Sequence, residues 1–423
     1  MEPPAASPDQ APRPAGSGAA PGGLADDRAA ARALDAPLAI AGCRLFEVAV
    51  PLVEPFRISG GTLARRRSLI VELSGASGAV GYGESAPFEE PFYSEETLQS
   101  CTGCIAAHLF PRLAGRSFAS LEAAVGALER GVRGNRMARA GVETALWDLL
   151  SAETGVPLRL LLGALMERLG VPEDFRVPSA TVESGAALGI PSDGRVETLA
   201  DRAREAVRRG HRRVKIKVMP GWDVVPVRAV RAAVGDGVPV WADANGAYAR
   251  ERDAAALEAL DHERLAMLEQ PLPPDDVIGT IRLGQELRTP LCLDESLTDD
   301  GAARLFLESD GPVLWNVKVQ RVGGLWESVR IYRRAVEAGV ALWAGSMPET
   351  GVGMHAVLSL AAFPGFLYPS DAAPSASWYE PGADLIEWTM DAEAKMPVSD
   401  VAGLAKLGVG DKLAGMGRVV GGL

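Results

Sequence analysis

The sequence predicts an α/β protein built around a closed barrel of parallel strands, preceded by a smaller α+β domain. Two observations carry this prediction. From about residue 175 onward, short apolar strands alternate with helical stretches at a steady interval, which is the pattern of repeated parallel βα units. The chain also lacks a GxGxxG or GxxxxGK[ST] loop, so a closed barrel is favoured over a nucleotide-binding doubly wound sheet.

Residues 40–165 have a different pattern, in which strands come first and helices follow. β-Branched runs broken by Gly and Ser fill residues 40–85, with a hairpin-like GASG turn, and helical spacing follows over residues 94–165. Strands followed by a block of helices indicate an α+β domain. The predicted organisation comprises a disordered Ala/Pro-rich tail, an α+β domain, the barrel and a C-terminal segment, over residues 1–38, 39–170, 171–375 and 376–423.

Six apolar runs are expected to be barrel strands, and helices are expected between them. The first strand of the barrel is expected earlier, in the segment VPSATVESG at residues 177–185. The six runs are 214–218, 238–243, 265–269, 290–294, 313–318 and 340–345.

Composition excludes several classes of function. The net charge of −12 argues against non-specific binding to nucleic acid or to anionic membranes, because both reward basic surfaces. No apolar run reaches the roughly 18 residues of a transmembrane helix, and a cytoplasmic location is the default expectation. The four cysteines give no disulfide framework, and the pair Cys101 and Cys104 lacks the second ligand pair of a zinc site.

Charged residues end the successive predicted strands. Lys217, Asp243, Glu269, Asp294 and Lys318 are separated by 26, 26, 25 and 24 residues, so each interval is one βα unit. Side chains at the carboxyl ends of barrel strands meet around one mouth, which is where barrel enzymes place their active sites. A single charged strand end would mean little, whereas a phased series of five predicts a catalytic ring.

The three carboxylates of this series are consecutive. Asp243, Glu269 and Asp294 would converge with excess negative charge, which is costly unless a cation lies between them. Because the ligands are hard oxygens with no Cys or His in phase, the pattern predicts Mg²⁺, with Mn²⁺ possible, rather than zinc. The competing interpretation is three salt-bridged acids on the surface.

Lysines flank the carboxylates on both sides. The period-2 alternation of a strand puts Lys215 and Lys217 on the lumen face, and Lys318 arrives from the opposite side of the ring. Desolvation and neighbouring positive charge are expected to lower a lysine pKa toward the range of a general base. A divalent ion on the substrate carboxylate, with lysines on both faces of its α-carbon, is an arrangement for α-proton abstraction.

At these positions the sequence resembles the enolase superfamily, in its muconate lactonizing enzyme subgroup. The resemblance rests on RRVKIKVMPGWD, WADANGAY, MLEQPL, LCLDES and NVKVQRVGGL, and it covers about residues 40–390. The segments PFRISGGTLARRRSLIVEL, EEPFYSEET, MPETGVG and SASWYE resemble the o-succinylbenzoate synthase/N-acylamino acid racemase family more narrowly. This implies a capping domain over a (β/α)₇β barrel, with the C-terminal segment returning to the cap.

The resemblance also implies roles. Asp243, Glu269 and Asp294 would bind Mg²⁺, Lys217 would be the base, Lys215 its electrostatic neighbour, and Lys318 the lysine of the opposite face. A synthase would dehydrate 2-succinyl-6-hydroxy-2,4-cyclohexadiene-1-carboxylate on the route to menaquinone, with Lys217 removing the proton and then protonating the departing hydroxyl. A racemase would use both lysines on one α-carbon.

Further residues are candidates for binding substrate or supporting the site, each with an ordinary structural alternative. Ser346 and the nearby Pro348 depart from the residues usual in relatives, which bears on substrate identity. The candidates are Glu295, Asn316, Arg321, Thr181, Ser346, Met347 and Tyr93.

Three readings of the function stay open at this point. The first is the synthase, the second an N-acylamino acid racemase or related epimerase, and the third a non-catalytic barrel. The two enzymatic readings make a small-molecule carboxylate the expected partner. Neither nucleic acid nor membrane is expected as a partner, and a homo-oligomer is possible.

Overall fold

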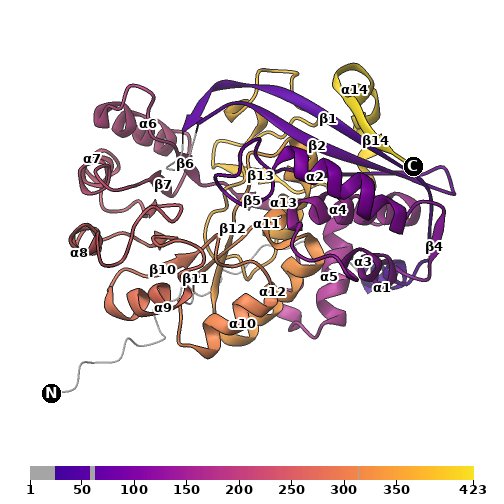
Figure 1. The fold of residues 1–423 in the computed structure, drawn as a ribbon, viewed down its shortest axis with the longest axis horizontal. Coiled ribbons are helices and arrows are strands. Elements are labelled where there is room, and N and C mark those ends of the chain that lie inside the picture. Colours follow the sequence, from indigo (N-terminus) through magenta and orange to yellow (C-terminus); the bar gives the residue numbers. More distant parts are fainter. Residues whose placement is uncertain (1–23, 58–61, 313) are drawn as a thin grey trace.

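The computed structural model describes residues 24–57, 62–312 and 314–423. Its N-terminal domain contains an antiparallel sheet in which β1 (Leu38–Arg57), β2 (Thr62–Gly75) and β3 (Val80–Ser85) are neighbours. β4 (Arg116–Phe118) also pairs with β1. On the free side of β1 lies β14 (Arg418–Gly422), so the end of the chain returns to the first sheet (Figure 1).

Helices cover one face of this sheet. They are α2 (Leu98–Cys104), α3 (Leu121–Glu129), α4 (Arg136–Thr154) and α5 (Leu158–Arg168). The side chain of Thr97 caps α2 by accepting from the backbone of Ser100. Glycine permits the close approach of α4 to β3, because a Cβ on Gly83 would lie 2.2 Å from the carbonyl oxygen of Gly141.

Seven parallel strands form the barrel sheet, in unbroken sequence order from β6 to β12. They are β6 (Ala186–Leu188), β7 (Val214–Lys217), β8 (Val240–Asp243), β9 (Leu268–Glu269), β10 (Leu291–Leu293), β11 (Leu314–Val317) and β12 (Ala341–Ala344). The eighth position is held by two isolated bridges, Leu342 with Phe366 and Ser184 with Ser370. The predicted (β/α)₇β barrel is therefore confirmed.

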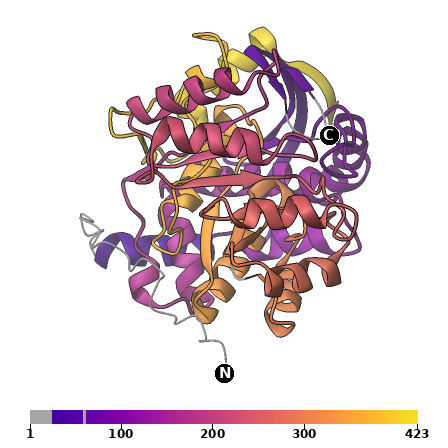
Figure 2. The ribbon, with the colours of Figure 1, turned by 90° about the vertical axis from the view of Figure 1, so that its left-hand side faces the viewer.

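Helices connect the strands and pack outside them, as Figures 1 and 2 show. They are α6 (Val196–Arg208), α7 (Val224–Val234), α8 (Ala254–Asp261), α9 (Val277–Glu286), α10 (Asp300–Glu308), α11 (Val319–Val322), α12 (Leu325–Ala338) and α13 (Gly351–Ala361). Apolar strand residues such as Val214 and Ile216 are fully buried against these helices. Their alternation leaves the intervening side chains for the lumen.

The C-terminal segment adds β13 (Lys395–Pro397) and α14 (Val409–Met416) before β14. β13 pairs antiparallel with β5 (Thr181–Glu183). The prediction that residues 177–185 form the first barrel strand is therefore wrong. That segment forms β5 outside the parallel sheet, and the first barrel strand, β6, begins only after Gly185. Alternation alone could not locate this break.

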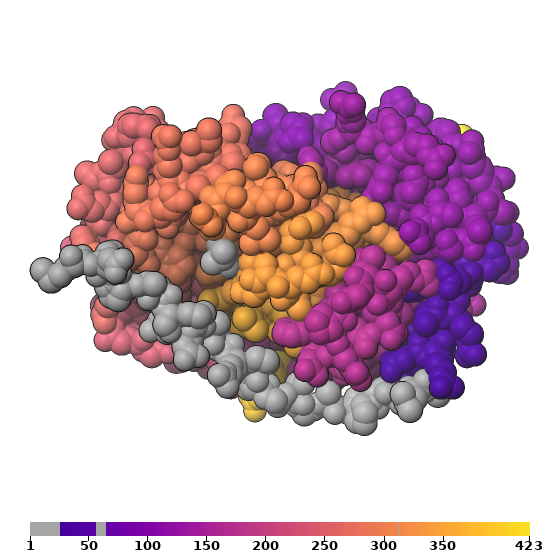
Figure 3. Space-filling view, turned by 90° about the horizontal axis from the view of Figure 1, so that it is seen from below, coloured from indigo at the N-terminus to yellow at the C-terminus, as the bar shows by residue number. Residues whose placement is uncertain are grey.

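The N-terminal boundary also differs from the prediction. Residues 1–23 of the predicted disordered tail lie outside the described residues, but Leu24–Leu34 form the helix α1. α1 contacts α5, with Ala30, Ala33 and Leu34 buried, and Figure 3 shows the indigo segment beside magenta α5. Disorder to residue 38 is thus wrong, because this alanine-rich stretch buries an apolar face.

Buried carboxylates join the N-terminal domain to the barrel. Glu84 of β3 accepts from the backbone N–H groups of Thr350 and Gly353, which begin α13. Glu143 of α4 accepts from those of Leu325 and Trp326, which begin α12. Helix N-termini have unpaired donors, so each carboxylate caps a helix of the other domain and fixes the cap over the barrel mouth.

Among the described helices, none alone is both long and apolar enough to cross a membrane. α4 and α5 pass that test only as a pair, and the pair is bent by 106°. All four cysteines are free and buried.

Candidate active site

Three buried carboxylates meet at the mouth of the barrel. Asp243 ends β8, Glu269 ends β9, and Asp294 directly follows β10. Each is fully buried and offers one oxygen, and these oxygens lie within 4.8 Å of one another. The three side chains converge as the sequence predicted. Because all three are buried, they are not salt-bridged acids on the surface.

The electrostatics of the cluster reveal its excess charge. Burial and the neighbouring Asp243 raise the pKa of Glu269 well above its usual range. Burial opposes ionisation of Asp294 too, but Lys318 and Arg321 outweigh it and hold the pKa of that carboxyl far below its usual range. Glu269 is therefore the carboxylate whose ionisation burial and Asp243 oppose more strongly than the neighbouring lysines favour it.

Lysines bracket the cluster from two sides. The Nζ atom of Lys217 lies 2.6 Å from Oδ2 of Asp243 and 2.9 Å from Oδ1 of Asn245. The Nζ atom of Lys318 lies 2.7 Å from Oδ2 of Asp294. Since β8 and β10 are separated by β9, the two ammonium groups approach the carboxylates from opposite edges.

Lys215 sits deeper in the lumen. Its Nζ is 3.2 Å from Oε2 of Glu269, 3.4 Å from Oδ2 of Asp243 and 2.6 Å from Oδ2 of Asp371. The expected lowering of lysine pKa values is wrong for Lys215 and Lys318. Burial does act in that direction, but the facing carboxylates outweigh it and raise both pKa values. A cation held by the same carboxylates would offset their field.

Three further predicted residues support the cluster. Asn316 donates from Nδ2 to Oε1 of Glu269 at 2.8 Å, and Arg321 pairs with Oδ1 of Asp294. Glu295 accepts from Nδ2 of Asn245 at 3.0 Å, and burial followed by the charge of Asp294 raises its pKa to about 7. These contacts orient the carboxylates that face the lumen.

The remaining predicted residues divide into two groups. Tyr93, from the cap, donates to Oδ1 of Asp294 at 3.0 Å, and Ser346 lines the cavity described below. Met347 is buried in the apolar core and is absent from the residues that line the cavity. Thr181 lies on exposed β5, before the first barrel strand, so the structure does not place it with the site.

Two charged residues of the lumen were missed by sequence reasoning. Arg213 precedes Lys215 by two positions on the same strand face, and it pairs with Asp371 while its guanidinium lies 4.2 Å from the ring centroid of Trp241. Asp371 bridges Arg213 and Lys215. Extending the period-2 series back to residue 213 would have found Arg213, whereas Asp371 lies outside any strand.

The donor set fits a divalent cation. The triad supplies three hard oxygens, and two nearby buried oxygens, Oε2 of Glu295 and Oδ1 of Asn316, receive no hydrogen bond from the described residues. Charged side chains of the lumen are balanced, with five of each sign, so a dication would add positive charge for an anionic substrate. The ten are Arg213, Lys215, Lys217, Lys318, Arg321, Asp243, Glu269, Asp294, Glu295 and Asp371.

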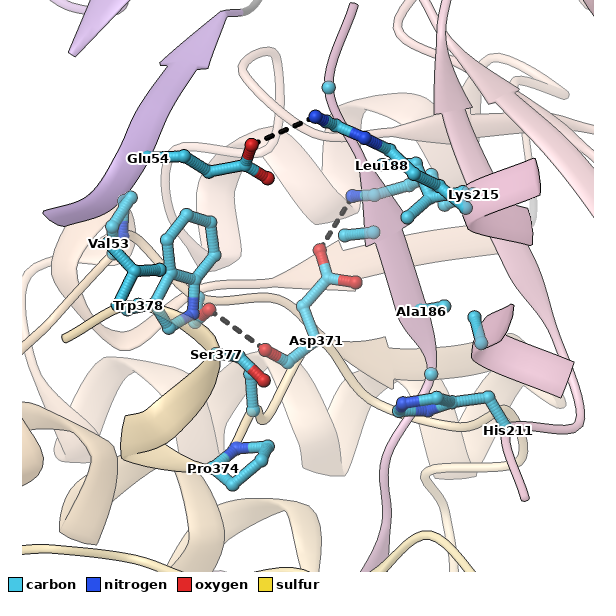
Figure 4. Close-up of a pocket in the computed structure, with 18 of the residues that line it drawn as sticks. Val53, Glu54, Ala186, Leu188, His211, Lys215, Asp371, Pro374, Ser377 and Trp378 are labelled. Carbon is cyan, nitrogen blue, oxygen red and sulfur yellow. Dashed lines mark hydrogen bonds and ion pairs between the residues drawn. The ribbon is translucent and has the colours of Figure 1, made fainter. Parts of the chain in front are cut away.

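A cavity of about 430 Å³ opens onto the three lysines. Figure 4 shows Val53, Glu54 and Trp378 on one wall, facing Leu188 and Lys215 across it. Its walls come from the tip of β1, from β6 and α6, and from the segment 371–378. The cap and the barrel thus both contribute to the space in which a substrate would contact the lysines.

Together, the capped barrel, the carboxylate cluster and the opposed lysines define a class of barrel enzyme with a candidate metal site at its mouth. Residues 40–163 match the mandelate racemase/muconate lactonizing enzyme N-terminal domain, and residues 198–405 match the enolase C-terminal domain-like family. The chain belongs to the enolase superfamily, in its muconate lactonizing enzyme subgroup, and is an enzyme of the lyase and racemase type found there.

Relatives of this chain include both a synthase and a racemase. The chain is 38% identical over 332 residues to an o-succinylbenzoate synthase of Geobacillus kaustophilus, covering 78% of this chain and 83% of the relative. It is 37% identical over 356 residues to an N-succinylamino acid racemase of Thermus thermophilus, covering 84% and 91%. A solved structure of a probable mandelate racemase from Alicyclobacillus acidocaldarius aligns with a TM-score of 0.78 at 32% identity, over 90% and 98% of the two chains.

Proposed function

We propose that this enzyme is an o-succinylbenzoate synthase, which dehydrates 2-succinyl-6-hydroxy-2,4-cyclohexadiene-1-carboxylate in menaquinone biosynthesis. The observation that carries the chemical class is the placement of Lys217 and Lys318 at opposite edges of one carboxylate cluster. Support for dehydration over other outcomes comes from the 38% identity to a synthase.

In this proposal Asp243, Glu269 and Asp294 hold Mg²⁺, or Mn²⁺ in its place. When bound, the cation supplies positive charge that stabilises the negative charge developing on the substrate carboxylate. Asn316 and Arg321 keep two of the three carboxylates oriented by the hydrogen bond and ion pair described above. The proposed substrate is a small-molecule carboxylate.

Lys217 is the proposed base. Its Nζ takes the proton from the carbon that bears the carboxylate, and the C–H electron pair becomes part of an enediolate. The same ammonium group then donates its proton to the departing hydroxyl, the C–O bond breaks, and water leaves from the same face. Lys318, on the opposite side, remains protonated and stabilises the enediolate through its charge.

The test is direct turnover of the cyclohexadiene substrate by the full-length enzyme in Mg²⁺, monitored by formation of the aromatic product. In parallel, α-deuterium exchange on N-succinyl amino acids is followed in D₂O. We expect dehydration to be the faster reaction. Exchange without any dehydration would refute the synthase assignment while leaving proton abstraction intact.

The second candidate function is N-succinylamino acid racemisation. The observation that favours it is that Lys217 and Lys318 lie at similar distances, 2.6 and 2.7 Å, from one triad carboxylate each. Racemisation needs proton transfer on both faces of the α-carbon, so it needs two such lysines. Arg321 lies in the same cluster, and the relative from Thermus thermophilus has this activity. One site could support both reactions.

A further inference from the structure

The cavity that the three lysines line is also bounded by residues of β6, α6 and the segment 371–378, and we call this part of it the arm. This arm runs between β6 and α6 on one side and the segment 371–378 on the other, under the tip of β1 (Figure 4). Small or apolar side chains form much of its wall. These residues include Ala186, Ala187, Leu188, Pro374, Ala376 and Trp378.

Cationic side chains from α6 and its C-terminal end also line the arm, and their pairing differs. Arg209 pairs with Glu205 of its own helix, with Nε 3.1 Å from Oε1. Nδ1 of His211 lies 3.0 Å from the backbone oxygen of Ser184, and burial lowers its pKa, so this imidazole is neutral near pH 7. Arg202 instead pairs with Glu54, which belongs to the cap, at 2.8 Å.

The pair of Arg202 and Glu54 is suited to exchange. Their side chains are 35% and 58% exposed, and ion pairs of that exposure contribute little net stability because water and salt screen them. Replacing the carboxylate of Glu54 by that of a ligand would therefore cost little. A guanidinium also binds carboxylates with two parallel hydrogen bonds, which gives it selectivity for that group.

We propose that Arg202 is a specificity-determining residue that binds the terminal carboxylate of the substrate's acyl chain, taking it in place of Glu54. The ligand class is a compound with one carboxylate at the reacting carbon and a second at the end of a short acyl chain. This inference rests on the proposed function, since it concerns the other end of the same substrate.

The experiment compares two ligands that differ only at the chain terminus. Binding of o-succinylbenzoate and of 2-butanoylbenzoate, whose chain ends in a methyl group, is measured by calorimetry with full-length enzyme in Mg²⁺. We expect the wild-type enzyme to prefer o-succinylbenzoate by roughly 10- to 100-fold, the range of a charged hydrogen bond to a carboxylate. The R202A variant should reduce this preference to less than about threefold by weakening only o-succinylbenzoate.

Matched variants separate this effect from a general loss of charge. Arg204 lies on the same helix, pairs with Asp201 and does not line the cavity, so R204A should keep the wild-type preference. The variant E54Q removes the competing carboxylate and should bind o-succinylbenzoate at least as tightly as the wild-type enzyme does. A weaker affinity for this ligand in E54Q, comparable to that of R202A, would contradict the exchange.

Turnover of the cyclohexadiene substrate is measured on the same preparations. Equal weakening of both ligands in R202A, or no preference in the wild-type enzyme, would overturn the role of Arg202. If the cyclohexadiene substrate is still turned over when either of these results is found, the proposed function stands without a role for Arg202. Selective binding without any dehydration or racemisation would refute the proposed function and leave the assignment of the arm in place.

Discussion

Two lysines of the site have nearly equivalent positions. Lys217 and Lys318 each make one short contact with a different member of the carboxylate cluster, and each is almost completely buried. Their side chains alone therefore do not distinguish elimination of water from reprotonation. In the proposed mechanism, the position of the leaving group relative to Lys217 decides that outcome, so substrate recognition and the fate of the enediolate would be linked.

Replacing the proposed base should abolish most of the chemistry. For K217A we expect kcat to fall by about 10²- to 10⁴-fold, the usual contribution of a positioned general base, with Mg²⁺ affinity retained because the triad is intact. Steady-state kinetics and metal titration measure the two quantities. The variant K395A removes an exposed lysine that pairs with Glu393 and serves as the control. Unchanged kcat in K217A would refute the assignment.

Sequence reasoning located the triad and the lysines because the βα interval fixes where strand ends fall around a barrel. It placed Thr181 on the first barrel strand, whereas β5 ends at Glu183 and the first strand of the parallel sheet, β6, begins at Ala186. Asp371 was missed for a different reason. It lies on an irregular segment with no strand pattern to mark it, although its contact with Lys215 is among the shortest in the lumen.

At the scale of elements, the cap is fixed to the barrel by carboxylates that cap helices across the domain boundary. Glu143 accepts from the backbone N–H groups of Leu325 and Trp326, and from Nε1 of Trp147. The contacts with Leu325 and Trp326 join residues 182 and 183 positions apart, so local propensity rules could not have predicted them. The individual helices were predictable, whereas their docking was not.

The pKa of Glu143 makes this docking sensitive to pH. Burial outweighs the three hydrogen bonds and raises the pKa to about 7, compared with about 4.3 in an unfolded chain. Between these values the folded state holds the extra proton. The corresponding stability is fully present below about pH 4 and is lost as the pH rises through 7, at about 1.4 kcal/mol per pH unit.

We therefore expect the E143Q variant to have a shallower dependence of stability on pH. Between pH 5 and pH 8, the wild-type free energy of unfolding should fall more than that of E143Q, by about 2–3 kcal/mol. Urea denaturation at the two pH values measures this difference. The variant E122Q changes an exposed glutamate of α3 and should keep the wild-type dependence. Parallel pH profiles of wild type and E143Q would contradict the role of Glu143.

At the scale of the whole molecule, the barrel provides the charged groups and the cap closes the space above them. Tyr93 shows the connection, because this cap residue contacts both Asp294 and Lys318, at 3.0 and 3.1 Å. The fold class was fully predictable from the repeat. The helix α1 was not, since its stability comes from packing on α5 rather than from its own sequence pattern.

Cation binding should stabilise the entire fold. The three buried carboxylates repel one another, so Mg²⁺ at 100 times its Kd should add about 2.7 kcal/mol to the free energy of unfolding. We expect Mg²⁺ to raise Tm in scanning calorimetry, and EDTA to reverse this rise and abolish activity until Mg²⁺ is restored. The variant D243N should show a smaller shift in Tm. Full activity in chelator would exclude the cation site.

The incomplete ladder at the eighth barrel position has a consequence for how such an enzyme can change. Residues 366–370 reach the neighbouring strands through only two isolated bridges, and the segment that follows them lines the cavity arm. The strands that hold the triad and the lysines do not pair with this segment, although its Asp371 forms an ion pair with Lys215. Under the proposed function, we therefore expect substitutions at residues 373–378 to change which acyl groups bind while the lysines and the triad stay in place.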